Sequence, residues 1–315
     1  MNASAKFAGF TVGLAAVFAL ALGAGAVFGP EGTTPADTHD TSTHDAGPGS
    51  TAGAPVADQT PGGLMVTDSG YTLALDTAQV PAGTDVPVRF RILDADGAPV
   101  TRYLDSHDKQ LHLIAVRRDM AGFQHLHPVR DAAGTWSVPV DLTRAGAYRV
   151  FADFTPDGGD GLTLGADLQV AGSYDPQPLP PVAATAVVDG YTVTLDGALQ
   201  PGQASKVTLS VSRDGRPVTD LQPYLGAYGH LVALRAADLG YLHVHPDGHP
   251  GDGVTAPGPG IDFFVTTPSA GDYRLFLDFQ HDGVVRTAEF TLTAGSVPGA
   301  AAPAAPGPMP AGHGH

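Results

Sequence analysis

Short segments in which apolar and polar residues alternate recur along most of this chain. The clearest are 71–76 (YTLALD) and 86–93 (VPVRFRIL), in which every second residue is apolar. Successive side chains of a β-strand point to opposite faces, so this alternation is typical of a strand with one buried face. Further strands are predicted at 111–117, 123–127, 135–140, 147–154 and 162–170. No segment after residue 28 has the period of an amphipathic helix.

The strand pattern occurs twice. Residues 111–128 (LHLIAVRRDMAGFQHLHP) align without a gap on 229–246 (GHLVALRAADLGYLHVHP), which places Met120 opposite Asp238. A later strand of each copy begins with Ala-Gly-x-Tyr-Arg, where immunoglobulin-like domains have a corner tyrosine. Strands at this spacing, broken by Gly and Pro turns, predict an all-β protein of two tandem immunoglobulin-like (cupredoxin-like) β-sandwich domains.

Changes in composition divide the chain into segments. The two predicted β-sandwich domains span residues 64–173 and 182–294. A Pro-rich segment, 174–181 (YDPQPLPP), is expected to be a stiff linker between them. Residues 29–63 and 295–315 are rich in Gly, Pro and Ala and lack hydrophobic periodicity. They are expected to be a disordered tether and a disordered tail.

The amino-terminal segment, residues 1–28, predicts export from the cytoplasm. Residues 7–28 are apolar and uncharged after Lys6, which is long enough for a transmembrane helix of about 20 residues. The small residues Ala24 to Ala26 also resemble the cleavage site of a secretory signal peptide. In the first case the domains lie on the extracytoplasmic face of the cell membrane, held by the helix. In the second case they are secreted.

Composition excludes several classes of function. The chain has 32 acidic and 16 basic residues, a net charge of −16, so there is no basic surface for nucleic acid. It has no cysteine, which excludes disulfides, thiolate ligands and thiol nucleophiles. There is no Gly-x-Ser-x-Gly, no phosphate-binding Gly loop and no His-Glu-x-x-His, so we expect a protein that is not an enzyme. No motif identifies a protein partner.

Candidate chemistry lies in a histidine pattern. His125 and His127 are two residues apart on a predicted strand, so both rings point to one face while Leu126 points to the core. His112 lies on the preceding strand, and a short turn joins the two strands into a hairpin that brings the rings together. Three imidazoles in this arrangement can hold one metal ion.

The second copy repeats the pattern with its own candidate ligands. These are His230, His243 and His245. Asp153 in the first domain and Asp278 in the second are candidates for a fourth ligand or for a carboxylate that orients an imidazole. His281 follows Asp278 closely and has no counterpart in the first domain. We therefore expect the second domain to bind the ion more tightly.

The ligand types narrow the choice of ion, and a structural role remains open beside it. Imidazoles without sulfur suit Cu(II), Zn(II) or Ni(II), which favours a copper or zinc ion as the cofactor. The alternative is that the histidines are structural. His112 precedes an apolar run, 113–116, as a hydrogen-bonded core histidine does, and the His-Pro pairs can simply end a strand.

Several of these features together resemble a known group of proteins. The apolar amino terminus, the two repeats and the HLHP and HVHP pairs with LHL and GHL upstream are similar to an uncharacterised family of envelope proteins from high-GC Gram-positive bacteria. Members are often labelled heavy-metal-binding. The resemblance implies an extracytoplasmic metal-binding protein, with copper as the first candidate. The alternative is a non-enzymatic envelope interaction or adhesion module.

Overall fold

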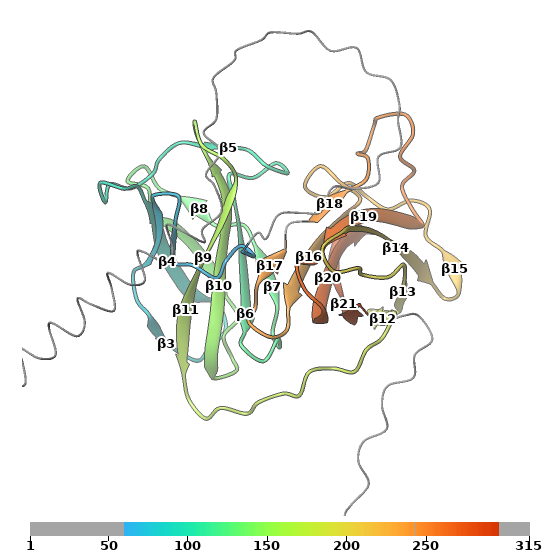
Figure 1. The fold of residues 1–315 in the computed structure, drawn as a ribbon, viewed down its shortest axis with the longest axis horizontal. Coiled ribbons are helices and arrows are strands. Elements are labelled where there is room, and N and C mark those ends of the chain that lie inside the picture. Colours follow the sequence, from blue (N-terminus) through green and yellow to red (C-terminus); the bar gives the residue numbers. More distant parts are fainter. Residues whose placement is uncertain (1–59, 243, 296–315) are drawn as a thin grey trace, which may run out of the picture. The chain divides into compact units, whose positions relative to one another are not determined.

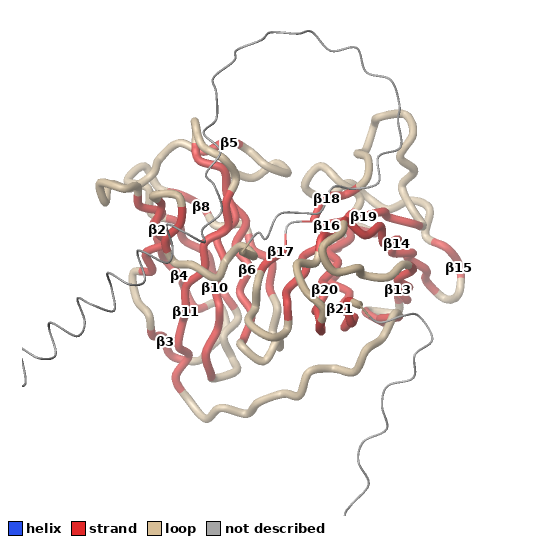
Figure 2. The backbone as a smooth tube through the Cα atoms, viewed as in Figure 1, coloured by secondary structure: helices blue, strands red, loops and turns tan. Residues whose placement is uncertain are grey.

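The computed structural model describes residues 60–242 and 244–295, without the side chain of His245. The described residues form strands and loops and contain no helix (Figure 2). None of them belongs to a helix that is long and apolar enough to cross a membrane. The predicted anchor, most of the predicted tether and the predicted tail lie outside the described residues.

The first sandwich contains two sheets (Figure 1). Its strands are β1 (Thr67–Asp68), β2 (Tyr71–Leu75), β3 (Gln79–Pro81), β4 (Val86–Leu93), β5 (Tyr103–Leu104), β6 (Leu111–Arg117), β7 (Gln124–Leu126), β8 (Val129–Arg130), β9 (Trp136–Val140), β10 (Gly146–Pro156) and β11 (Leu162–Ala171). One sheet has the order β1-β2-β4-β9-β8. The other has the order β3-β11-β10-β6-β7, with β5 paired to β10.

The second sandwich repeats this plan (Figure 1). Its strands are β12 (Thr185–Val188), β13 (Tyr191–Asp196), β14 (Ala204–Arg213), β15 (Arg216–Pro217), β16 (Gly229–Arg235), β17 (Tyr241–Leu242), β18 (Val244–Pro246), β19 (Gly260–Thr266), β20 (Gly271–His281) and β21 (Val284–Ala294). One sheet has the order β12-β13-β14-β19-β18, with β15 paired to β14. The other has the order β17-β16-β20-β21.

Each sandwich encloses a core built from the alternating positions that the sequence predicts. In β4, Val88, Phe90 and Ile92 are buried, whereas the residues between them are exposed or half-buried. The corner tyrosines are also in place, since the hydroxyl of Tyr148 donates to the carbonyl of Arg144 at 2.9 Å. Tyr273 makes the equivalent bond to Ser269 at 2.8 Å. The prediction of two tandem immunoglobulin-like β-sandwiches is confirmed.

A third apolar cluster joins the two sandwiches, and we call it the interdomain core. It explains why every residue of β6 is buried, although a strand with one solvated face would alternate. Phe123 stacks on Phe276 of the second sandwich, with ring centroids 3.9 Å apart. Burying Phe276, which is 0% exposed, contributes about 1.5–3 kcal/mol, and the half-buried Phe123 contributes less. The interdomain core consists of Ile114, Val116, Met120, Phe151, Val232, Leu234, Leu239 and Phe276.

The interdomain core also corrects the gap-free alignment of the two copies. The structural counterpart of Met120 is Leu239, not Asp238. Both have a positive φ, 66° and 65°, and both belong to the interdomain core. The carboxylate of Asp238 instead accepts two hydrogen bonds from Arg235, as Asp119 does from Arg117. The second copy therefore has one residue more before this position and one residue fewer after it.

Candidate metal centre

The β6–β7 hairpin brings His112, His125 and His127 together, and we call these three residues the histidine triad. In the hairpin register Leu113 lies opposite Leu126, which places His112 beside His127. Leu126 packs against the core of the first sandwich, so the flanking histidines point away from it. One ring nitrogen from each of the three residues lies within 4.8 Å of the others.

The spacing of the three rings matches the geometry of a shared ion. Their centroids are 5.2 Å (His112 to His125), 5.1 Å (His112 to His127) and 5.0 Å (His125 to His127) apart. Three imidazoles on one tetrahedral ion, with metal–nitrogen bonds of about 2.0–2.1 Å, place their centroids about 5.2 Å apart. The ring nitrogens, which lie within 4.8 Å of one another, must move closer together to share an ion.

Both ends of the His112–His125 pair meet a hydrogen-bond acceptor. Nε2 of His112 lies 3.0 Å from the carbonyl oxygen of Ser106. Nδ1 of His112 faces Nε2 of His125 at 3.0 Å. Nδ1 of His125 lies 2.8 Å from Oδ2 of Asp278, which belongs to the second sandwich. Asp278 also accepts a hydrogen bond from Thr287.

This row of contacts contains more hydrogen bonds than two neutral rings can supply. Two neutral imidazoles carry two N–H protons, whereas the three contacts need three. A third proton on one ring, or a divalent cation between the facing nitrogens of His112 and His125, would make up the difference. With the cation in place, both outer N–H groups would be free to donate, one to a backbone carbonyl and one to a carboxylate. Metal-bound histidines usually have these outer partners.

The third member of the triad carries an unsatisfied nitrogen. Nε2 of His127 is buried and has no hydrogen-bond partner. Burial, and then the neighbouring rings of His125 and His112, lower the pKa of His127 to about 3. Burial likewise lowers the pKa of His112 to about 4. These rings are therefore neutral near pH 7, which is the form that binds metal ions.

His230, expected to belong to a second and separate triad, lies beside the first one. Its ring centroid is 6.4 Å from that of His112 and 6.3 Å from that of His125. Nε2 of His230 donates to the carbonyls of Tyr224 and Leu225, 3.0 Å away in each case, and Nδ1 therefore carries the lone pair. Burial lowers the pKa of His230 to about 4.

The other members of the second triad cannot be compared in the same way. His243 and the side chain of His245 lie outside the described residues. The backbone of His245 pairs with Phe264 of β19, in the sheet opposite the one that contains His230. A second metal centre of these three residues stays a prediction.

The two candidate carboxylates have different partners. Asp153 lies opposite His112 in the β10–β6 register and accepts a hydrogen bond from Thr163 at 2.8 Å. Burial, and then Asp153, raise the pKa of Tyr241 well above its usual value. Asp278 instead contacts His125, a histidine of the other copy. Asp278 therefore contacts an imidazole, which is one of the two roles that the sequence suggested for it, but the imidazole belongs to the first sandwich.

His281 does not join the centre. It lies three residues after Asp278 on β20, so it points to the opposite face, as Phe279 of the core does. Its Nδ1 lies 2.7 Å from the hydroxyl of Tyr191, and its Nε2 lies 3.1 Å from Asp220. Tighter binding by the second domain stays a prediction.

Sequence reasoning missed His107, which lies in the turn before β6. Its ring centroid is 4.9 Å from that of His230 and 6.2 Å from that of His112. Leu225 occupies the equivalent turn position in the second copy, and both residues have a positive φ. A histidine present in only one of two matched turns is the signal that could have found it. His107 lines a small cavity of about 40 Å³ with His112, His125, His230 and Asp153.

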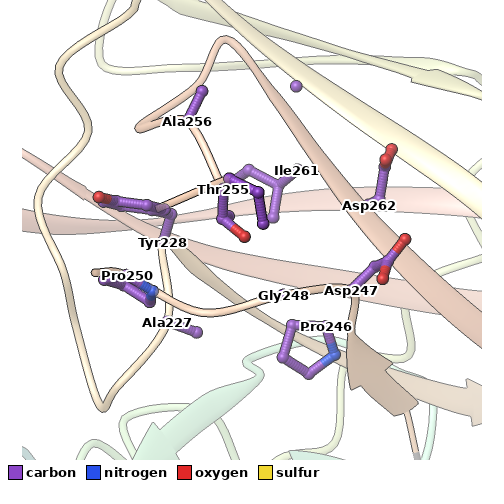
Figure 3. A pocket seen from close by; sticks show the side chains of 12 residues that line it. Ala227, Tyr228, Pro246, Asp247, Gly248, Pro250, Thr255, Ala256, Ile261 and Asp262 are labelled. Carbon is purple, nitrogen blue, oxygen red and sulfur yellow. The ribbon is translucent and has the colours of Figure 1, made fainter. Parts of the chain in front are cut away.

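A larger hollow of about 300 Å³ lies in the second sandwich (Figure 3). The loop between β18 and β19 and the start of β19 form much of its wall. Asp247 and Asp262 lie on one side of it, and Lys206 contacts both carboxylates, at 3.3 Å and 2.9 Å. None of the described residues that line this hollow is a histidine. It is separate from the triad and offers no comparable set of metal ligands.

A family model matches both copies. It is described as "Domain of unknown function (DUF8832)" and matches residues 65–172 and 186–296, more than half of the chain. This chain belongs to the DUF8832 family. The narrower resemblance, to envelope proteins of high-GC Gram-positive bacteria, stays a prediction. Comparison with curated proteins gave no match.

Solved structures similar to this DUF8832 protein include bacterial surface proteins. The Yersinia pseudotuberculosis adhesin InvE is 14% identical, with a TM-score of 0.23, over 74% of this chain and 60% of that chain. Invasin, a bacterial integrin-binding protein, is 16% identical, with a TM-score of 0.21, over 71% and 39%. The chain spans 58% of the length of InvD from the same Yersinia species. Likenesses this low carry no argument about function, and the fold assignment rests on the strand topology.

Proposed function

We propose that this protein is a non-enzymatic metal-binding module whose centre is the histidine triad. One observation carries the proposal: three rings lie 5.0–5.2 Å apart, and one of them has a buried nitrogen without a partner. A buried polar atom without a hydrogen bond costs about 1–3 kcal/mol. A bound ion removes that cost and takes up the facing nitrogens of His112 and His125 as well.

The donor set favours copper or zinc. Neutral imidazoles without sulfur suit Cu(II) and Zn(II) better than they suit Mg²⁺ or Ca²⁺, which prefer oxygen ligands. Ser106 and Asp278 provide the carbonyl and the carboxylate that hold the outer nitrogens of two ligands. Three protein ligands leave a fourth position for water or for a small ligand. The cavity beside these residues measures only about 40 Å³, far below the size of a usual ligand pocket.

A structural role for the histidines is the second candidate. It is favoured by one observation, that all four ring nitrogens of His112 and His125 have partners within the protein. On this reading the protein is an interaction or adhesion module, and the triad holds the two sandwiches together. The adhesins among the similar structures agree with this reading, at a likeness too low to support it.

We also propose an extracytoplasmic location. The proposal rests on the apolar run at residues 7–28 and the family resemblance noted from the sequence. Retention by the membrane and secretion after cleavage remain the two alternatives.

Metal analysis of the untagged protein tests the proposal. Isothermal titration with Zn(II) and with Cu(II) is compared for the wild type and for His125→Ala with His127→Ala. A matched control, His313→Ala with His315→Ala, removes the histidines of the carboxyl-terminal tail. We expect the triad variant to lose one bound ion per chain and the control to keep it. Equal stoichiometry and affinity in all three proteins would support the structural role instead.

A further inference from the structure

The carboxylate that holds the metal-binding triad in place belongs to the other sandwich. Oδ2 of Asp278 lies 2.8 Å from Nδ1 of His125, and the two side chains are 5% and 6% exposed. Both are therefore shielded from solvent. Hydrogen bonds to charged groups are strongest in such a buried environment. No other described hydrogen bond joins a triad histidine to the second sandwich.

The sign of this contact depends on which nitrogen of His125 carries the proton. The carbonyl of Ser106 needs an N–H at Nε2 of His112, which leaves a lone pair on Nδ1. Without an ion, Nε2 and Nδ1 of His125 face two acceptors, that lone pair and the carboxylate of Asp278, and a ring with one N–H can donate to only one of them. Nothing then fixes the ring N–H on the nitrogen that faces Asp278.

An ion fixes this contact. A metal ion bound to Nε2 of His125 forces the ring proton onto Nδ1, because a ligating nitrogen cannot carry a proton. Nδ1–H then donates to the carboxylate of Asp278, as metal-bound histidines commonly do. We infer that ion occupancy of the triad clamps the second sandwich onto the first through Asp278. This inference rests on the proposed metal-binding function and adds what ion binding does to the contact between the two sandwiches.

The clamp lies beside an apolar contact between the sandwiches. Phe123 precedes His125 by two residues, and Phe276 precedes Asp278 by two residues, so each pair shares one face of its strand. The Phe123–Phe276 stack and the His125–Asp278 contact are therefore successive contacts between the same two strand segments. We expect that tightening one contact also slows local opening at the other.

Hydrogen exchange on the full-length chain tests the clamp. Amide exchange of β6, β7, β16 and β20 is measured in EDTA and with saturating Zn(II), and Zn(II) affinity is measured by titration. We expect Zn(II) to slow exchange in β16 and β20 of the second sandwich as well as in β6 and β7. Asp278→Asn should keep Zn(II) binding at an affinity lowered about 10–100-fold and should lose the effect on β16 and β20.

A control on the same strand separates the clamp from general damage. Asp272 is an exposed residue of β20 that accepts a hydrogen bond from Thr293, so Asp272→Asn should behave as the wild type does. Zn(II) binding that protects only β6 and β7 would overturn the clamp and leave the proposed function intact. Protection of β16 and β20 by Zn(II) in Asp278→Asn, to the same extent as in the wild type, would also overturn the clamp and leave the proposed function intact. Absence of Zn(II) binding in the wild type would overturn both.

Discussion

Replacement of His127 by leucine separates the metal-binding role from the structural one, because the two predict changes of opposite sign. Nε2 of His127 is buried without a partner in the metal-free protein, an arrangement that costs about 1–3 kcal/mol. Leucine has a similar size and no polar atom to satisfy. In EDTA, His127→Leu should therefore raise the free energy of unfolding by about 1–3 kcal/mol.

The same change should abolish stabilisation by the ion. Zn(II) at a hundred times its dissociation constant adds about 2.7 kcal/mol to the unfolding free energy of a protein that binds it. Wild type should gain this amount and His127→Leu should gain almost nothing. Urea unfolding, followed by the fluorescence of Trp136, measures both quantities.

An exposed histidine provides the control for this experiment. His249 lies in the loop after β18 and is exposed, so His249→Leu should leave both quantities unchanged. If His127 instead supports the fold, His127→Leu will lower stability in EDTA. A destabilised variant that still gains stability from Zn(II) would refute the reasoning, because it would show that His127 neither lacks a partner nor binds the ion.

Three further predictions concern pH and packing. In EDTA, the free energy of unfolding should fall as pH drops from about 6.5 to about 4, by about 1.4 kcal/mol per pH unit for each of His112 and His230. The reason is that their lowered pKa values let the unfolded chain bind protons that the folded chain does not. Urea midpoints across this range should fall steadily, and a flat profile would contradict the pKa shifts. Arg117→Ala should lower the free energy of unfolding by about 3–5 kcal/mol, because Arg117 and its partner Asp119 are 1% and 8% exposed. Arg235→Ala should lower it less, since Arg235 and Asp238 are 18% and 38% exposed. Equal losses of stability in thermal unfolding would count against this ranking. Phe276→Ala should lower the free energy of unfolding by about 3–5 kcal/mol and speed amide hydrogen exchange in β6 as well as in β20. Faster exchange confined to β20 would show that the interdomain core does not join the two sandwiches.

The fold could be predicted because its information is local. Alternation in β4 and β10 depends only on which face of one strand is buried, and the corner tyrosines depend on one short motif. The β6–β7 hairpin could also be predicted, since a short turn fixes the register that brings His112 to His127.

The shared nature of the centre could not be predicted, because it depends on contacts between the two copies. The sequence of β6 is apolar on both faces, which signals a second covering layer but does not say what that layer is. Only the structure places Asp278 against His125. The position of His281, in contrast, follows from counting: three residues after Asp278, it had to face the other way. One residue is inserted and one is deleted within the turn, so the gap-free alignment paired Met120 with Asp238 and missed its structural counterpart, Leu239.

Anomalous X-ray scattering from crystals grown with one equivalent of Zn(II) tests the central claim most directly. Data collected above and below the zinc edge locate the ion without reference to any variant. We predict one peak in the first sandwich, about 2.0–2.1 Å from a ring nitrogen of each of His112, His125 and His127. Nδ1 of His125 should then lie within hydrogen-bonding distance of Asp278. Zinc found only at the carboxyl-terminal histidines, or no peak beside the triad, would contradict the account.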